Sequence, residues 1–233
     1  MSVVDAKEVT VMQMAKNFDL KKWWNSVIDE VIRFPLYVLS KPFKAFSDIK
    51  YEGKGSLPAC IFFMVMLMLL SVMRQSYTGT VFVMVDPRYQ NIWTVMAGVL
   101  IQTLFIVIAN WSVSVLTNGS GSFKEIFMVA MYAQYPYMWL SALYLALSHI
   151  LSLNEQALLT FCISLGIVCI VFYGFIGLVS VHCYGFFQGI ASILLTILSL
   201  IIIIFIILML VSMGSELVSF VSTVYKEIVL NYF

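Results

Sequence analysis

The sequence predicts an all-α, polytopic integral membrane protein with five membrane-spanning helices. Hydrophobic residues make up 62% of the 233 residues and charged residues only 11%, whereas a soluble domain is about 45–50% apolar and about 25% charged. A soluble protein of this length could not bury so much apolar surface. Two long stretches contain no charged residue: one lies between Glu125 and Glu155, and the other between Glu155 and Glu216.

Five apolar runs are long enough to cross the hydrocarbon core, which takes about 20 residues. They cover residues 57–73, 92–116, 126–151, 157–181 and 189–213. The fourth and fifth runs together are too long for one crossing. We place the break at His182-Cys183-Tyr184-Gly185, because glycine there favours a turn.

The distribution of Lys and Arg predicts the orientation, because loops on the cytoplasmic side carry more of them. With the N-terminus inside, nine basic residues before the first span and Lys124 lie inside, and Arg74, Arg88 and Lys226 lie outside. The ratio of ten to three favours a cytoplasmic N-terminus. Five spans then place the C-terminus outside.

Three regions follow from this pattern. Residues 1–56 form a cytoplasmic N-terminal region, in which residues 23–34 are amphipathic and include the interface-seeking Trp23 and Trp24. Residues 57–213 form the membrane domain. Residues 214–233 form an external amphipathic helix that lies on the membrane surface or docks on a partner. Its apolar stripe consists of Leu217, Phe220, Val221, Val224 and Ile228.

The connection between the second and third runs is predicted to be a short cytoplasmic hairpin. Asn118-Gly119 favours a tight turn. Ser122 and Glu125 have the spacing of a capping box, in which each side chain pairs with a backbone N–H of the helix that follows.

The sequence contains no catalytic, cofactor-binding or metal-binding signature. The four cysteines lack metal-site spacing, and His149 and His182 lie near opposite membrane faces. A lipid-acting enzyme that uses His182 is a third alternative, although adjacent His182 and Cys183 would point apart on a helix and so could not act as base and nucleophile. The net charge of +1 without a basic stripe disfavours nucleic-acid binding.

Uncharged polar residues inside the predicted spans leave two interpretations open. Gln102, Asn110 and Gln134 can hydrogen-bond between helices and stabilise the bundle. Together with a kink at Pro136, they could instead line a path for a neutral or weakly polar solute.

Several short motifs, in this order, resemble the Yip (Ypt/Rab-interacting protein) domain family in its bacterial branch, over about residues 35–230. They are Lys41-Pro42-Phe43-Lys44-Ala45-Phe46-Ser47-Asp48-Ile49, Asn110-Trp111, the stretch from Leu116 to Ile126, Tyr132 with Pro136, Leu153-Asn154-Glu155, His182-Cys183-Tyr184-Gly185-Phe186 and Leu194-Leu195-Thr196.

The resemblance implies a five-span bundle with a cytoplasmic N-terminus. It also implies a non-enzymatic membrane adaptor, which is the role of eukaryotic members, and some bacterial relatives accompany sugar importers. Because the N-terminal region of this chain is shorter than in the eukaryotic members, the resemblance does not extend to a small-GTPase partner.

We therefore expect a non-catalytic adaptor or accessory subunit in the bacterial cytoplasmic membrane, without a cofactor. Its expected partners are the lipid bilayer and another membrane protein, with a sugar-importer subunit as a candidate, and no nucleic acid. The alternative is a transporter or channel for a neutral or weakly polar solute. The candidate interaction or packing residues are Asn110, Trp111, Asn118, Gly119, Gly121, Gln134, Pro136, His182 and Tyr184.

Overall fold

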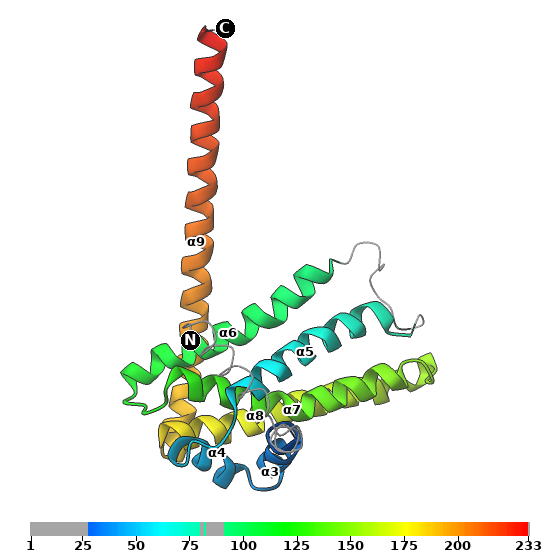
Figure 1. Ribbon diagram of the computed structural model, residues 1–233. Coiled ribbons are helices and arrows are strands. Elements are labelled where there is room, and N and C mark those ends of the chain that lie inside the picture. The colour runs from blue at the N-terminus through cyan, green and yellow to red at the C-terminus, as the bar shows by residue number, and fades with distance from the viewer. Residues whose placement is uncertain (1–27, 80–81, 83–90, 233) are drawn as a thin grey trace, which may run out of the picture.

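The computed structural model describes residues 28–79, 82 and 91–232, and over these residues the chain is almost entirely helical and contains no strand (Figure 1). The all-α prediction is confirmed. The helices in chain order are η1 (Asp29–Arg33), α3 (Phe34–Ser40), α4 (Pro42–Tyr51), α5 (Leu57–Tyr77), α6 (Ile92–Leu116), α7 (Phe123–Leu147), η4 (Leu153–Glu155), α8 (Gln156–His182) and α9 (Phe186–Tyr232).

The long helices begin where the sequence supplies a cap. The Ser56 hydroxyl accepts a hydrogen bond from the Ala59 N–H at the start of α5, and the Asn91 side chain accepts one from the Trp93 N–H at the start of α6. The predicted capping box of Ser122 and Glu125 is confirmed at the start of α7. Such caps satisfy backbone donors that would otherwise lack a partner.

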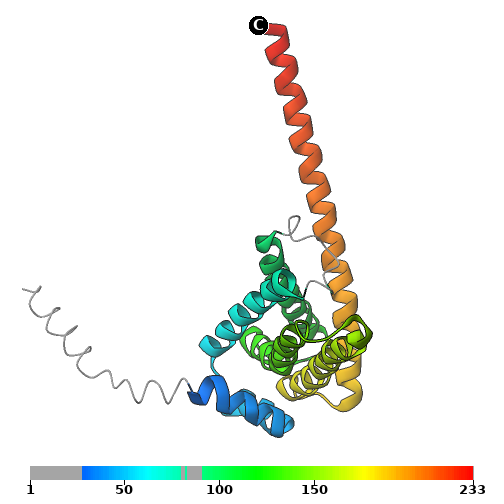
Figure 2. The same ribbon diagram turned by 90° about the vertical axis from the view of Figure 1, so that its right-hand side faces the viewer.

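Helix α7 lies at the centre of the bundle. It contacts α5, α6 and α8, while α4 packs on α8 and α9 packs mainly on α6. Figure 2 looks approximately along the axes of α5 to α8, whereas α9 stands across them and extends far beyond the bundle. The long apolar helices thus form a bundle of four with a fifth that diverges from it.

Within the described part of the chain, four helices are long and apolar enough to cross a membrane, and they identify an integral membrane protein. They cover Leu57–Tyr77, Ile92–Leu116, Leu153–His182 and Phe186–Val229, and each contains one of the five predicted spans. The third predicted span corresponds to α7, whose 25 residues are more polar because they include Gln134, Pro136 and several tyrosines.

The limits predicted for the third span are wrong by a few residues at both ends. The prediction was residues 126–151, but α7 runs from Phe123 to Leu147. It begins earlier because the Ser122 cap starts the helix ahead of the apolar run. It ends earlier because the chain turns at Ser148, whose hydroxyl donates to the Leu145 carbonyl.

Two of the four tyrosines of α7, Tyr132 and Tyr135, are buried inside the bundle, and Tyr137 and Tyr144 are partly buried. Tyr132 is only 1% exposed, and its ring meets the edges of Phe34 and Phe63. The Ser56 N–H donates to the Tyr132 hydroxyl at 3.2 Å. This one side chain therefore joins α3, the start of α5 and α7, which is why a polar helix is accommodated at the centre.

The N-terminal region packs on the bundle. Residues 23–27 of the predicted amphipathic segment lie outside the described residues, and the segment from Ile28 onward is helical. In α3 and α4, Val38, Ala45 and Phe46 are fully buried in the same core as Phe63 and Tyr132. An interfacial helix alone does not describe this region, because its apolar face is covered by α7 and α8.

The C-terminal segment is not separated from the last predicted span. Helix α9 is continuous for 47 residues, so no break occurs at residue 214. Gly214 lies inside the helix, since one glycine costs only about 1 kcal/mol there. Every residue from Ile204 to Val229 is exposed on the isolated chain.

Helices α7 and α8 approach closely at Gly177. A Cβ atom on Gly177 would lie 2.5 Å from the Val129 side chain and 3.1 Å from Phe46. Three residues earlier, a Cβ atom on Gly174 would lie 4.0 Å from Ala133, which is an ordinary contact. Small residues of this kind let membrane helices pack closely.

We expect Gly177→Ala to melt at a lower temperature than Gly174→Ala in mild detergent, because only the first variant forces Val129 and Phe46 to move. Both variants gain the same helix propensity, so the difference reports overpacking, which costs about 1–3 kcal/mol. Equal melting temperatures would contradict the close approach at Gly177.

Candidate functional site

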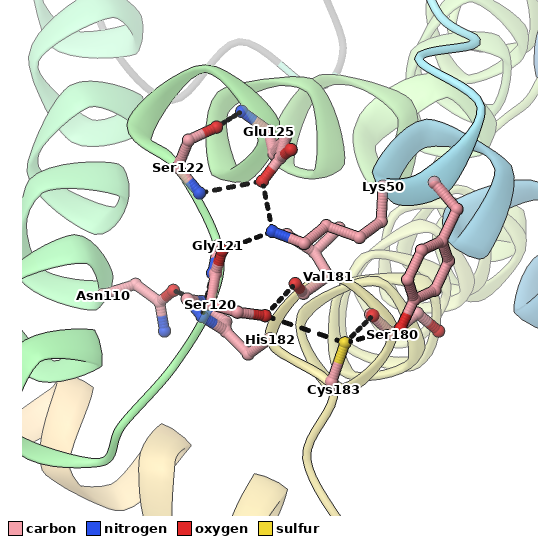
Figure 3. Close-up of polar contacts among 11 residues, drawn as sticks. Lys50, Asn110, Ser120, Gly121, Ser122, Glu125, Ser180, Val181, His182 and Cys183 are labelled. Carbon is pink, nitrogen blue, oxygen red and sulfur yellow. Dashed lines mark hydrogen bonds and ion pairs between the residues drawn. The ribbon is translucent and has the colours of Figure 1, made fainter.

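Most of the candidate residues meet at one end of the bundle. The ends of α6 and α8, the 117–122 loop, and the starts of α7 and α9 come together there with α4 (Figure 3). We call this cluster the polar junction. It consists of Lys50, Asn110, Thr117, Gly119, Gly121, Glu125, His182, Tyr184, Gln188 and Thr196.

His182 is the centre of the polar junction. It is the last residue of α8 and only 2% exposed. Its Nδ1 accepts a hydrogen bond from the Gly121 N–H at 3.1 Å. Because a backbone N–H can only donate, the proton of the neutral ring is placed on Nε2, which donates to Asn110 Oδ1 at 3.0 Å. Both ring nitrogens are therefore occupied.

Asn110 extends this connection to α9. It is 1% exposed, and its Nδ2 donates to Thr196 Oγ1 at 3.0 Å. The Thr196 hydroxyl in turn donates to the Ser192 carbonyl at 2.8 Å. Buried polar groups are costly unless each has a partner. Here the chain of partners runs from the 117–122 loop through α8 and α6 to α9.

The loop needs glycine at positions 119 and 121, because its backbone lies very close to His182 and Tyr184. A Cβ atom on Gly119 would lie 2.2 Å from the Tyr184 hydroxyl, and one on Gly121 would lie 2.6 Å from His182 Cε1. The Tyr184 ring also stacks on His182, with ring centroids 4.9 Å apart. Any side chain at either glycine would separate the loop from α8.

The start of α9 is held to the end of α6 by two further contacts. The hydroxyls of Thr117 and Tyr184 are hydrogen-bonded to each other. The Gln188 amide donates to the Thr117 carbonyl at 2.9 Å. These contacts fix the direction in which α9 leaves the bundle.

Lys50 joins α4 to the same loop. Its ammonium lies 3.1 Å from Glu125 Oε2 and donates to the Ser120 carbonyl. Burial alone would raise the pKa of Glu125, but the Ser122 backbone N–H and the Lys50 ammonium stabilise the carboxylate and lower that pKa overall. The pair is mostly shielded from solvent, with the two side chains 16% and 19% exposed.

Cys183 does not form a catalytic pair with His182. Its thiol contacts the Tyr51 and Ser120 hydroxyls on the α4 side of the junction (Figure 3). Hydrogen bonds from these two hydroxyls lower the pKa of Cys183. The imidazole has no free nitrogen for this thiol, because it is bonded to Asn110 and Gly121. A nucleophile needs a base within hydrogen-bond reach.

Four of the predicted candidates lie outside the polar junction's hydrogen bonds. Trp111 is 47% exposed and packs edge-to-face on Phe123. Asn118 forms the turn with a positive φ of 52°. Gln134 donates to the Ala130 carbonyl of its own helix, and α7 continues through Pro136. Gln102, which we grouped with Asn110 and Gln134, is exposed on another face of α6.

Sequence reasoning missed Lys50, Thr117, Gln188 and Thr196 as members of the junction, and it predicted Glu125 only as part of the capping box. Thr196 carries the clearest signal, because it is one of few polar residues in the apolar run 189–213. Lys50 gave no local signal, since it contacts Glu125 across 75 residues of sequence. The described residues include no group of three His, Cys, Asp or Glu side chains that could hold a metal ion.

The Yip1 domain matches residues 36–214. The chain belongs to the Yip1 domain family. No curated protein and no solved structure matches it. The whole polar junction lies within the matched part of this Yip1 domain, as do α5 to α8.

In this Yip1 domain, the His182–Asn110 bond joins two helices at a buried site. We expect His182→Leu to destabilise the protein by about 1–3 kcal/mol, because Asn110 Oδ1 and the Gly121 N–H lose their partner. Asn110→Leu, His182→Leu and the double variant form a double-mutant cycle, followed by thermal melting in detergent. The double variant should lose less than the sum of the single losses. Strict additivity would contradict the bond.

The Lys50–Glu125 pair should give a pH-dependent stability. The pKa of Glu125 is lowered in the folded protein, so its contribution is fully present above the unfolded pKa of about 4.3 and is lost as the pH falls through the lower folded pKa. We expect Glu125→Gln, which keeps the capping geometry, to be about 1 kcal/mol less stable than wild type at pH 7.

The difference between wild type and Glu125→Gln should shrink below about pH 4.3, and it should be smaller in a Lys50→Met background. Melting temperatures across the pH range measure both effects. A difference that does not change with pH would show that the charge of Glu125 contributes nothing.

Proposed function

We propose that this Yip1-domain protein is a non-catalytic membrane adaptor or accessory subunit that binds another membrane protein through α9. The observation that carries the proposal is the length and exposure of α9. The helix has 47 residues and is exposed from Ile204 to Val229.

Helix α9 is longer than a bilayer. At about 1.5 Å per residue it measures about 70 Å, whereas a bilayer with its headgroups is about 40–45 Å thick. Even at a tilt of about 40°, the upper end of the usual range, about 54 Å would remain along the membrane normal. Part of α9 therefore extends beyond the lipid if it crosses the membrane.

The part that would leave the lipid carries the apolar stripe of residues 217–228. Phe220, Val221 and Val224 are exposed, while Ser219 and Thr223 occupy neighbouring positions around the helix. An amphipathic helix of this kind docks with its apolar side in the groove of a partner. Because α9 is longer than the bilayer, lipid cannot cover all of its apolar surface, and a partner protein would cover the rest.

The polar junction supports a structural rather than a catalytic role. His182 has both nitrogens bonded within the protein, and Cys183 is turned toward Tyr51. An open catalytic site needs a base that can reach a substrate.

We also propose five crossings, with α7 as the third, a cytoplasmic N-terminus and an external C-terminus. Lys50 in α4 contacts the 117–122 loop, and Tyr51 contacts Cys183 after α8. These segments share one end of the bundle, as expected if α5 with α6 and α7 with α8 each cross out and back. The central position of α7 keeps its polar residues away from lipid. Helix α9 would cross at a different tilt.

The proposed partner is a membrane protein that offers an apolar groove on the outer side. A sugar-importer subunit in the bacterial cytoplasmic membrane is a candidate because of the family resemblance. A transporter for a neutral solute is the second possibility. It is less well supported because Asn110, His182 and Thr196 fill one end of the space between α6, α7 and α8 with hydrogen bonds made to each other and to the loop.

The proposal predicts that a membrane protein co-purifies in stoichiometric amount with the full chain, tagged at its N-terminus and extracted in mild detergent. Phe220→Asn with Val224→Asn should remove that partner, because both changes lie on the apolar stripe. The matched control is Ser219→Asn with Thr223→Asn, which places the same side chains at the same spacing beside the stripe and should keep the partner. Neither pair touches the bundle.

Two results would contradict the proposal. One is that the chain purifies without any partner protein in every mild detergent. The other is a partner that both double variants retain equally, since the stripe would then not be its docking surface.

A further inference from the structure

A second feature of the bundle is a cavity that the adaptor proposal does not use. It lies among α6, α7, α8 and the first part of α9, with a volume of about 300 Å³, and it is partly open. Ligand cavities measure about 300–1,000 Å³. This space is thus sufficient for one small ligand or one aliphatic chain.

The lining of the cavity is almost wholly apolar. It includes Ile106, Val129, Phe175 and Leu200, and no Asp, Glu, Lys, Arg or His among the described residues lines it. A charged ligand group would have no countercharge in this space, and burying an unpaired charge is costly. An occupant must therefore be uncharged and largely aliphatic.

Thr103 on α6 is a buried polar group that lines the cavity without a hydrogen-bond partner. It is 4% exposed, and its hydroxyl makes no hydrogen bond with any other described residue. The hydroxyls of Thr160, Thr196 and Thr223 each donate to the carbonyl four residues earlier. Leaving a buried hydroxyl unpaired is unfavourable, so Thr103 is available for a ligand.

Gln134 on α7 supplies a complementary group. Its amide nitrogen donates to the Ala130 carbonyl at 3.2 Å, whereas its side-chain oxygen has no partner among the described residues. Thr103 lies seven residues before Asn110 on α6, and Gln134 lies eight residues after Ile126 on α7, which runs the opposite way. At about 1.5 Å per residue, both lie about 10–12 Å from the same end of the cavity.

We propose that this cavity binds an uncharged lipid with an aliphatic chain and a free hydroxyl, such as a long-chain alcohol, or a diacylglycerol that places one of its two chains in the cavity and the other outside its open side. The ligand hydroxyl would donate to the Gln134 oxygen and accept from the Thr103 hydroxyl. An ester carbonyl can only accept, and a carboxylate is charged. A hydroxyl satisfies both protein groups while the chain fills the apolar space.

The test uses the full chain, purified in detergent, and a photoreactive hexadecanol that carries an alkyne for detection. Labelled peptides should come from α6, α7, α8 and the first part of α9. Gly174→Leu should lower the labelling about fivefold or more, because the new side chain enters the cavity, which Gly174 lines. Gly98→Leu is the matched control, since nothing lies within 4 Å of a Cβ atom at that exposed position on α6.

A second pair of variants tests the hydrogen bond. Thr103→Val should lower the labelling about fivefold, whereas Thr103→Ser should restore it. Thr160→Val removes a hydroxyl from an exposed position of α8 and should change nothing. Without ligand, Thr103→Val should melt at the same or a higher temperature than wild type, because an unpaired hydroxyl is removed.

Competition identifies the source of the hydroxyl. If unlabelled diacylglycerol competes as well as hexadecanol, the ligand is a glycerolipid, and if hexadecanol alone competes, it is a free alcohol. Palmitate and phosphatidylglycerol should compete weakly, since each is charged. Equal labelling of wild type and Gly174→Leu, or equal competition by palmitate, would overturn the proposal. Loss of the co-purifying partner would not affect this result.

Discussion

The neutral ring of His182 is the interaction on which the rest of the arrangement depends. It accepts from the Gly121 N–H and donates to Asn110, so that one side chain fixes the 117–122 loop, α6 and α8 together. Its place at the last residue of α8 also sets the turn into α9. Because every partner is buried, loss of one contact leaves others unpaired, and the network behaves as a unit.

The packing of α7 shows how this protein accommodates a polar helix at the centre of its bundle. Helix α7 carries tyrosines that lipid would not tolerate well, but its neighbours cover them, and Tyr132 is only 1% exposed. The surrounding helices α5, α6, α8 and α9 expose many large apolar side chains. A hydropathy pattern therefore describes the periphery of this fold better than its centre.

The two proposed binding surfaces differ in chemistry. The exposed length of α9 offers an apolar stripe to a protein. The cavity among α6, α7 and α8 offers one unpaired hydroxyl in apolar surroundings. The polar junction anchors the start of α9, and the cavity-lining part of that helix, Ile193 to Leu200, lies between the junction and the exposed length.

The sequence by itself determined the all-α membrane class, four of the apolar spans, the capping box at Ser122 and the turn at Asn118, because these depend on composition and neighbouring residues. Only the tertiary structure decided that Asn110, Gly119, Gly121, His182 and Tyr184 meet, and that Lys50 and Thr196 join them. It also decided that Gln102 faces outward and that α9 continues past residue 214. Contacts across 60 to 90 residues arise from helix packing, which no local pattern encodes.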